Sequence, residues 1–165
     1  MLFEKGNEVL SVLSKLPVKE CPCDMTLERR LRLAQCNVEN HNADLENINP
    51  ELVGANGRFK TPEQLLRWLI DNKPSEELSV THGDFCLPNI IVCENKVGII
   101  DFPFGGIADK YSDIALFYRS VKSNLGGKYG GKVYGELDEK LFFDILGITP
   151  RFDKIEFYIL LNELF

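Results

Sequence analysis

Apolar residues return every three or four positions through most of the chain. Segments 1–16, 27–38, 136–146 and 153–164 each carry such a stripe, and the spacing predicts four amphipathic helices. Another helix is predicted from Asp109, whose carboxylate can cap it, to about residue 123. The pattern therefore indicates a mostly helical protein.

A further helix has the most explicit start signal. Thr61, Pro62 and Gln64 are residue types preferred at the N-cap, the first and the third positions of a helix. Trp68, inside this helix, is interpreted as a packing residue, with stacking on a ligand as the alternative. The apolar positions that should form its buried face are Leu65, Leu66 and Leu69.

One segment departs from the helical pattern. Two short β-branched runs, 90–93 and 97–100, flank the polar tripeptide 94–96, and together they predict an antiparallel hairpin. Asn89 enters this hairpin and Asp101 leaves it, so the two should be cross-strand neighbours with Cα atoms roughly 5 Å apart. An amide oxygen and a carboxylate at one end of a hairpin can ligate a hard cation such as Mg²⁺.

A third polar residue lies close to this predicted metal site. Asp84 precedes Asn89 by five positions, on the loop that enters the same end of the hairpin. Its carboxylate can accept a proton from a substrate hydroxyl, and the spacing of Asp84, Asn89 and Asp101 matches the catalytic loop and metal-binding Asp of protein kinases. The alternative is a solvated turn in which Asp84 and Asn89 make local backbone bonds. The hairpin and Asp101 favour a phosphoryl-transfer site.

Four segments around this site resemble one family of small-molecule kinases. They are HGDFCLPNI at 82–90, IID at 99–101, ADKYSDIA at 108–115 and FYILLNELF at 157–165. They look like the aminoglycoside 3'-phosphotransferases, and the likeness runs from about residue 9 to the last residue. The resemblance implies an α+β, predominantly helical fold: the C-terminal lobe of a protein-kinase-like fold, with the hairpin carrying the catalytic loop.

The resemblance also implies how the chain is organised. Residues 1–165 are expected to form a single domain, with a substrate-side acidic loop at 41–60 and the catalytic loop and metal hairpin at 81–101. The family's N-terminal nucleotide-binding lobe is expected to be absent, or to be supplied in trans. The glycine-rich stretch 125–132 is interpreted as a helix-to-helix loop; the alternative, a phosphate-binding loop, lacks Gly-Lys-Ser/Thr and a preceding strand.

The net charge of the chain limits which classes of binding partner are expected. The formal net charge is −6, which argues against nucleic acid and anionic membranes and favours a cationic ligand. No apolar run is long enough for a membrane span or signal peptide, and five cysteines without a secretory signal fit a reducing compartment. We expect a cytoplasmic protein.

The resemblance places the acceptor among polar residues of the loop and the last helix. Asp44 on the loop is one of the acids near the expected amines, while Asn49 and Asn162 stand where the family usually has acids. His82 and Asp113 are expected to support the catalytic loop rather than to react. The predicted substrate-binding residues are Glu46, Asn47, Arg119, Asn162, Glu163 and Phe165, the last through its terminal carboxylate.

The resemblance finally implies an activity: transfer of the γ-phosphoryl of ATP, with Mg²⁺, to a hydroxyl of a polycationic aminoglycoside. Such a reaction would confer antibiotic resistance. Phe102, Pro103 and Phe104 follow Asp101 where the family has a Gly and then a basic residue. With the nucleotide lobe missing as well, this chain alone is expected to have little or no activity. Two alternatives stay open: a non-catalytic polycation-binding module or remnant, and a kinase of another small hydroxyl compound.

Overall fold

The computed structural model describes residues 2–43, 49, 53–54, 57–94 and 96–165. Its helices are α1 (Leu2–Leu13), α2 (Leu27–Glu39), α3 (Pro62–Asp71), α4 (Tyr111–Leu125), α5 (Glu139–Leu146) and α6 (Phe152–Asn162), with short 3-10 turns η1 (Val18–Glu20) and η2 (Leu87–Asn89). Its strands are β1 (Leu78–Thr81), β2 (Ile90–Cys93), β3 (Lys96–Ile99) and β4 (Gly106–Asp109). The predicted helical character is confirmed.

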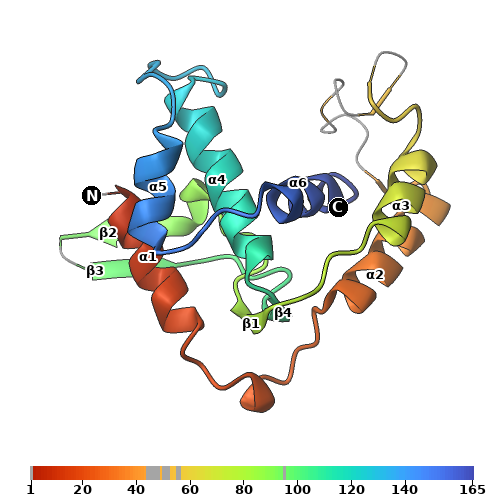
Figure 1. Ribbon diagram of the computed structural model, residues 1–165, viewed down its shortest axis with the longest axis horizontal. Helices are drawn as coiled ribbons and strands as arrows, with labels where there is room; N and C mark the ends of the chain where they lie inside the picture. The colour runs from red at the N-terminus through yellow and green to blue at the C-terminus, as the bar shows by residue number, and fades with distance from the viewer. Residues whose placement is uncertain (1, 44–48, 50–52, 55–56, 95) are drawn as a thin grey trace.

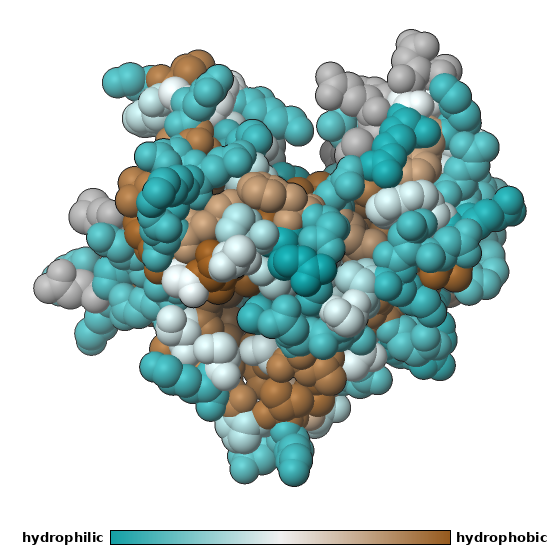
Figure 2. Space-filling model, viewed as in Figure 1, coloured by the Kyte–Doolittle hydropathy of each residue, from teal (hydrophilic) through white to brown (hydrophobic). Residues whose placement is uncertain are grey.

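Two helices pack on each other in the middle of the molecule, and the others flank them. α4 packs on α6, while α1 pairs with α5 on one side and α2 pairs with α3 on the other (Figure 1). Figure 2 shows a notch between these two sides at the top of the view, where the surface is hollowed above α6. In the described part of the chain, no helix is long and apolar enough to cross a membrane.

Local sequence sets the helix ends. The hydroxyl of Thr61 accepts the N–H of Gln64 at 3.4 Å, and the Gln64 side chain accepts the N–H of Lys60 at 2.8 Å, so the predicted start of α3 is confirmed. Asp138 caps α5 by accepting the N–H of Leu141 at 2.9 Å. Gly147 ends α5 in the left-handed conformation, with φ 66°, which glycine adopts without strain.

A second small sheet, which the sequence pattern did not predict, frames the candidate site. β1 pairs antiparallel with β4, and Thr81 at the end of β1 lies opposite Gly106 at the start of β4. Residues 82–105 therefore leave and re-enter the same end of this sheet. The hairpin β2–β3 lies within that excursion.

The register of the hairpin corrects one prediction. Cys93 pairs with Lys96, so β3 starts one residue earlier than expected, and the Asn89 carbonyl accepts the N–H of Ile100 at 3.1 Å. Asn89 is thus opposite Ile100, and Asp101 lies one residue beyond. The physical reason is a tighter turn, which begins at Glu94 with φ 52°.

A chain of aromatic rings connects the candidate site to the core. Phe85 is fully buried, and its ring lies 5.8 Å from the His82 ring and 5.3 Å from the Phe117 ring. The Phe117 ring lies 5.3 Å from that of Phe142 on α5. Trp68 lies between Phe59 and Phe157, with centroids at 5.8 Å and 6.2 Å, in agreement with its interpretation as a packing residue.

A buried polar network fixes the start of α4. Asp109 is the last residue of β4 and not the N-cap of α4, which is Lys110, so the predicted helix starts two residues later than expected. The Asp109 carboxylate still accepts the Tyr111 N–H at 3.0 Å, and it pairs with the Lys154 ammonium of α6 at 2.9 Å. The Tyr158 hydroxyl donates to the same carboxylate at 3.2 Å. Neither Asp109 nor Lys154 is more than 1% exposed, so this ion pair is fully removed from water.

Candidate active site

Asp113, in the first turn of α4, holds the loop that follows β1. Its Oδ2 accepts the N–H of His82 at 2.7 Å, and its Oδ1 accepts the N–H of Gly83 at 2.8 Å. Complete burial raises the pKa of this carboxyl to about 6, although the two N–H bonds and the Arg30 charge act in the opposite direction. Asp113 therefore fixes the backbone immediately before Asp84.

His82 connects the same loop to the end of the hairpin. Its Nδ1 accepts the Asp84 N–H at 3.3 Å, which leaves Nε2 to carry the proton and donate to the Ile100 carbonyl at 2.9 Å. Its ring also lies 4.2 Å from the ring of Phe102. One buried imidazole thus joins three segments of the candidate site.

Gly83 satisfies two demands at once. Its φ is 88°, a conformation that side-chain-bearing residues rarely adopt, and a Cβ there would lie 2.2 Å from the carbonyl oxygen of Phe104. The loop before Asp84 and the segment after Asp101 are therefore in backbone contact. No other residue type fits between them.

Asp84 and Asn89 meet directly. The Asn89 Nδ2 donates to the Asp84 carboxylate at 3.0 Å and to the Asp84 carbonyl at 2.9 Å. Asp84 is half-buried, whereas Asn89 is 8% exposed. Because both bonds use Nδ2, the amide oxygen of Asn89 points away from Asp84 and can ligate a cation.

Asp101 is exposed, and it makes no hydrogen bond or ion pair with any residue that the structure describes. Its φ of 62° is uncommon for a residue with a side chain. In an extended strand, the register would turn Asp101 to the face opposite that of Asn89, but the left-handed backbone ends that alternation. Strain of this kind concentrates at functional positions.

The donor set fits Mg²⁺. In the described ranges, no three His, Cys, Asp or Glu side chains gather as a metal site. Mg²⁺ needs no such cluster, since it usually takes one or two protein oxygens and completes its shell with phosphates and water. Asn89 and Asp101 offer that kind of oxygen.

Cys86, beside Asp84, can be excluded as a nucleophile. Burial and the neighbouring Asp84 charge raise the pKa of its thiol to about 11. The reactive form of a cysteine is the thiolate, which is scarce at neutral pH under these conditions. The side chains of this loop therefore support acid–base rather than covalent chemistry.

Two of the predicted acceptor residues, Arg119 on α4 and Glu163 at the end of α6, are brought together and bind each other. The Glu163 carboxylate accepts from the Arg119 guanidinium at 2.9 Å and from the N–H of Asn49 at 3.0 Å. Asn162 and Phe165 are both partly exposed nearby in the chain. The remaining predicted contacts lie outside the described residues: Asp44, Glu46 and Asn47.

Arg30, on α2, was not singled out from the sequence. Its guanidinium is buried near the candidate site, over the rings of Phe104 and Phe165. An arginine on an otherwise amphipathic helix gives no signal of its own. Only the fold reveals its position.

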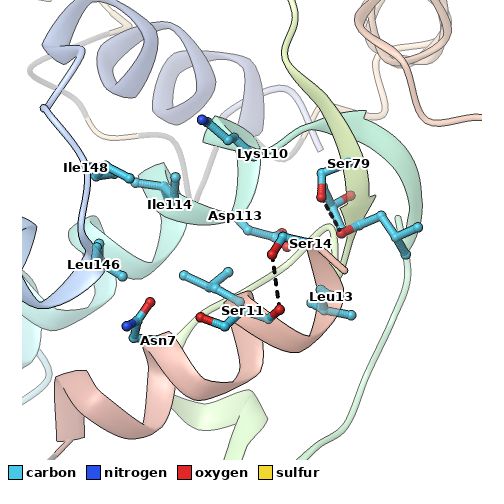
Figure 3. Close-up of a pocket in the computed structure, with 13 residues that line it drawn as sticks. Asn7, Ser11, Leu13, Ser14, Ser79, Lys110, Asp113, Ile114, Leu146 and Ile148 are labelled. Carbon is cyan, nitrogen blue, oxygen red and sulfur yellow. Dashed lines mark hydrogen bonds between the residues drawn. The ribbon is translucent and has the colours of Figure 1, made fainter. Parts of the chain in front are cut away.

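A cavity of about 220 Å³ lies behind Asp113, between α1, β1 and the start of α4. Figure 3 shows Asp113 in its wall beside Ser14, the residue that directly follows α1. Among the described lining residues, only Asp113 belongs to the predicted site, and both of its oxygens are already bonded to the loop. This cavity is therefore separate from the predicted acceptor residues.

Comparison with known proteins agrees with this geometry. Residues 2–142 match the model of APH, the phosphotransferase enzyme family. An aminoglycoside 3'-phosphotransferase of Enterococcus faecalis is 38% identical over 165 residues, which are 99% of this chain and 58% of the relative. Another, from Staphylococcus aureus, is 36% identical over 99% of this chain and 59% of its own length.

Solved structures give the same result. An aminoglycoside-3'-phosphotransferase of type VIII superimposes with a TM-score of 0.83 at 27% identity, over 99% of this chain and 60% of that one. The aminoglycoside phosphotransferase APH(3'')-Id from Streptomyces rimosus, in complex with ADP and streptomycin, gives 0.74 at 27% identity, over 98% and 61%. The chain spans about three fifths of these relatives, and it matches the C-terminal part of their kinase-like fold. The chain belongs to the phosphotransferase enzyme family.

Proposed function

We propose that the loop and hairpin of residues 82–101 carry ATP-dependent phosphoryl transfer to a hydroxyl of an aminoglycoside. The observation that carries this proposal is the cross-linked loop in which Asp84 stays half-exposed while Asn89 holds its carboxylate at 3.0 Å. A carboxylate held in this way is oriented to accept a proton from a substrate hydroxyl. The sequence relatives, named aminoglycoside 3'-phosphotransferases, support the acceptor class.

Each residue then has a distinct task. Asp84 orients the acceptor hydroxyl and takes its proton. Asn89 and Asp101 supply oxygens that would hold Mg²⁺, and the ion would neutralise charge on the transferring phosphoryl group. His82 and Asp113 keep the loop in place through the bonds described above and do not touch the reacting atoms.

The acceptor side is proposed from the family relationship and from charge. Arg119, Asn162, Glu163 and the terminal carboxylate of Phe165 would line it, together with Glu46 and Asn47. A net charge of −6 favours a polycation there. The structural relative from Streptomyces rimosus is in complex with ADP and streptomycin, which supports a nucleotide and an aminoglycoside as the ligand pair.

Exposed apolar residues of the hairpin support a place for a nucleotide-binding lobe. The hairpin and the residues beyond it expose Ile91, Val92, Ile100 and Phe102, each 48–49% exposed. Ile91 and Val92 are successive residues of β2 and so leave apolar surface on both faces of the hairpin, and exposed apolar surface of this kind favours a covering partner. A nucleotide-binding lobe, in the same polypeptide or in trans, fits this role, because the relatives are longer than the chain.

The test uses a fusion protein, in which the unmatched N-terminal part of the Enterococcus relative precedes this chain. The measurement is transfer of labelled γ-phosphoryl from ATP to a panel of aminoglycosides. We expect transfer by the joined protein and little or none by the chain alone. Calorimetry on the chain alone distinguishes the two non-catalytic alternatives, a polycation-binding module and a remnant. Salt-sensitive aminoglycoside binding, with no transfer by the joined protein, would instead support a non-catalytic module; absence of both would support a remnant.

One observation favours a different acceptor. Glu163 is already paired with Arg119, so an acceptor amine would have to compete with a guanidinium for this carboxylate. A less cationic hydroxyl compound would not face that competition. Including neutral sugars and amino alcohols in the acceptor panel decides between the two classes.

A further inference from the structure

Arg30 is a buried cation that forms no ion pair with any carboxylate among the described residues. The residue is 2% exposed, and its Nε and Nη2 have no hydrogen-bond acceptor in the described part of the chain. Burial lowers the pKa of its guanidinium, while the charges of Asp113 and Asp84 raise it, so both carboxylates are close enough to act on it. A charge in such a position is costly unless something else compensates it.

Two aromatic rings provide that compensation. The Arg30 guanidinium carbon lies 5.5 Å from the centroid of the Phe104 ring and 5.2 Å from that of the Phe165 ring. The two rings meet each other edge to face, with centroids 4.9 Å apart. Aromatic faces attract cations, and the attraction is strongest where water is excluded.

The two rings come from opposite sides of the candidate site. Phe104 belongs to the segment after Asp101, whose backbone contacts Gly83 and whose Phe102 ring lies 4.2 Å from that of His82. Phe165 is the terminal residue, two positions after Glu163. Arg30 therefore stands between the proposed phosphoryl-transfer loop and the proposed acceptor residues.

We propose that Arg30 is a positioning residue: its guanidinium, held between Phe104 and Phe165, fixes residues 102–105 against the catalytic loop and couples that loop to the C-terminal residue. The inference rests on the proposed function only in what the loop positions. The contacts are made by residues of the chain itself. Arg30 acts through Phe104 and touches none of the proposed reacting groups.

The test is amide hydrogen exchange on the whole chain, without ligands. The reporters are the bonded N–H groups of His82, Gly83, Asp84 and Gly105, and core amides of α1 and α5 serve as reference. Arg30→Met keeps an unbranched side chain but removes the charge. We expect exchange of the reporters to accelerate at least tenfold relative to the reference amides.

Matched variants make the result specific. Arg30→Lys keeps the charge and should retain part of the protection, whereas Arg29→Met removes an exposed arginine of the same helix and should change nothing. Phe104→Leu keeps apolar volume but removes the ring face, so it should reproduce the effect of Arg30→Met. In the double variant the reporter amides should exchange little faster than in either single variant, because both substitutions remove the same contact.

Three results would overturn the proposal: unchanged reporter exchange in Arg30→Met, equal acceleration of reporter and reference amides, or strictly additive effects of the two substitutions. If Arg30→Met does not fold, Phe104→Leu and Arg30→Lys decide in the same assay. Exchange needs no turnover, so an inactive protein would count against the proposed function and not against Arg30.

Discussion

The two sides of the candidate site are built differently. On the proposed phosphoryl-transfer side, residues 82–105 are held by the carboxylate of Asp113, the imidazole of His82 and the amide of Asn89, all at hydrogen-bonding distance. On the acceptor side, Arg119 and Glu163 pair with each other and are 31% and 10% exposed. The first set is held by several bonds within the protein, while Arg119 and Glu163 must exchange their mutual contact for contacts with a ligand.

The proposed function accounts for this difference. Phosphoryl transfer depends on placing a few oxygens accurately, so burial and multiple bonds serve it. An acceptor that varies among compounds is better met by exposed charges, whose interactions cost little to rearrange. Substitutions should therefore lower the free energy of unfolding strongly on the first side and only slightly on the second.

The largest expected loss of stability comes from the buried ion pair between Asp109 and Lys154, which supports the proposed phosphoryl-transfer side. Lys154→Met leaves the carboxylate of Asp109 buried without its cation, and breaking such a pair costs about 3 to 5 kcal/mol of unfolding free energy. Chemical denaturation measures it. Lys140→Met removes an exposed pair with Asp144 on α5 and should have no measurable effect. Equal losses in the two variants would contradict the comparison.

Gly83→Ala should have the next largest effect. The substitution forces a left-handed residue and a contact with the Phe104 carbonyl, which together should cost about 2 kcal/mol or more. Gly98→Ala on β3 is the control, because a Cβ there meets no atom within 4 Å. A stability for Gly83→Ala within experimental error of the control would show that the two segments are not held together.

A pH titration tests Asp113. Burial raises the pKa of its carboxyl to about 6 from an ordinary value of 3.8, so between these values the folded state binds the proton and the unfolded state does not. The free energy of unfolding should therefore fall as pH rises through this window, by up to about 1.4 kcal/mol per pH unit from this group. Asp113→Asn should remove that slope. An identical slope in the variant would place the titrating group elsewhere.

The smallest effect is expected on the acceptor side. Because the Arg119–Glu163 pair is partly exposed and screened by water, its coupling energy should be below about 1 kcal/mol. A double-mutant cycle with Arg119→Gln and Glu163→Gln at low and high salt measures it. Coupling above about 2 kcal/mol that does not depend on salt would mean that this side is as rigid as the other.

The same division separates what the sequence could and could not predict. Helices and the β2–β3 hairpin follow from local periodicity and from end signals such as Thr61, and they were predicted. The pairing of β1 with β4, the burial of Arg30 and the Lys154 network join residues far apart in sequence, so no local pattern encodes them. The hairpin register was wrong by one residue, because the length of a turn depends on backbone conformation at Glu94 rather than on residue type alone.

The most direct measurement of the central claim is phosphoryl transfer by the chain joined to the unmatched first part of the Enterococcus relative, in two variants. Asp84→Ala removes the group that orients the hydroxyl, and the account predicts a fall in turnover of about 10²- to 10⁴-fold with little change in stability. Glu163→Gln should stay within about tenfold of the parent turnover, with its main effect on acceptor KM. Turnover by Asp84→Ala equal to that of the parent would contradict the assignment of the catalytic loop.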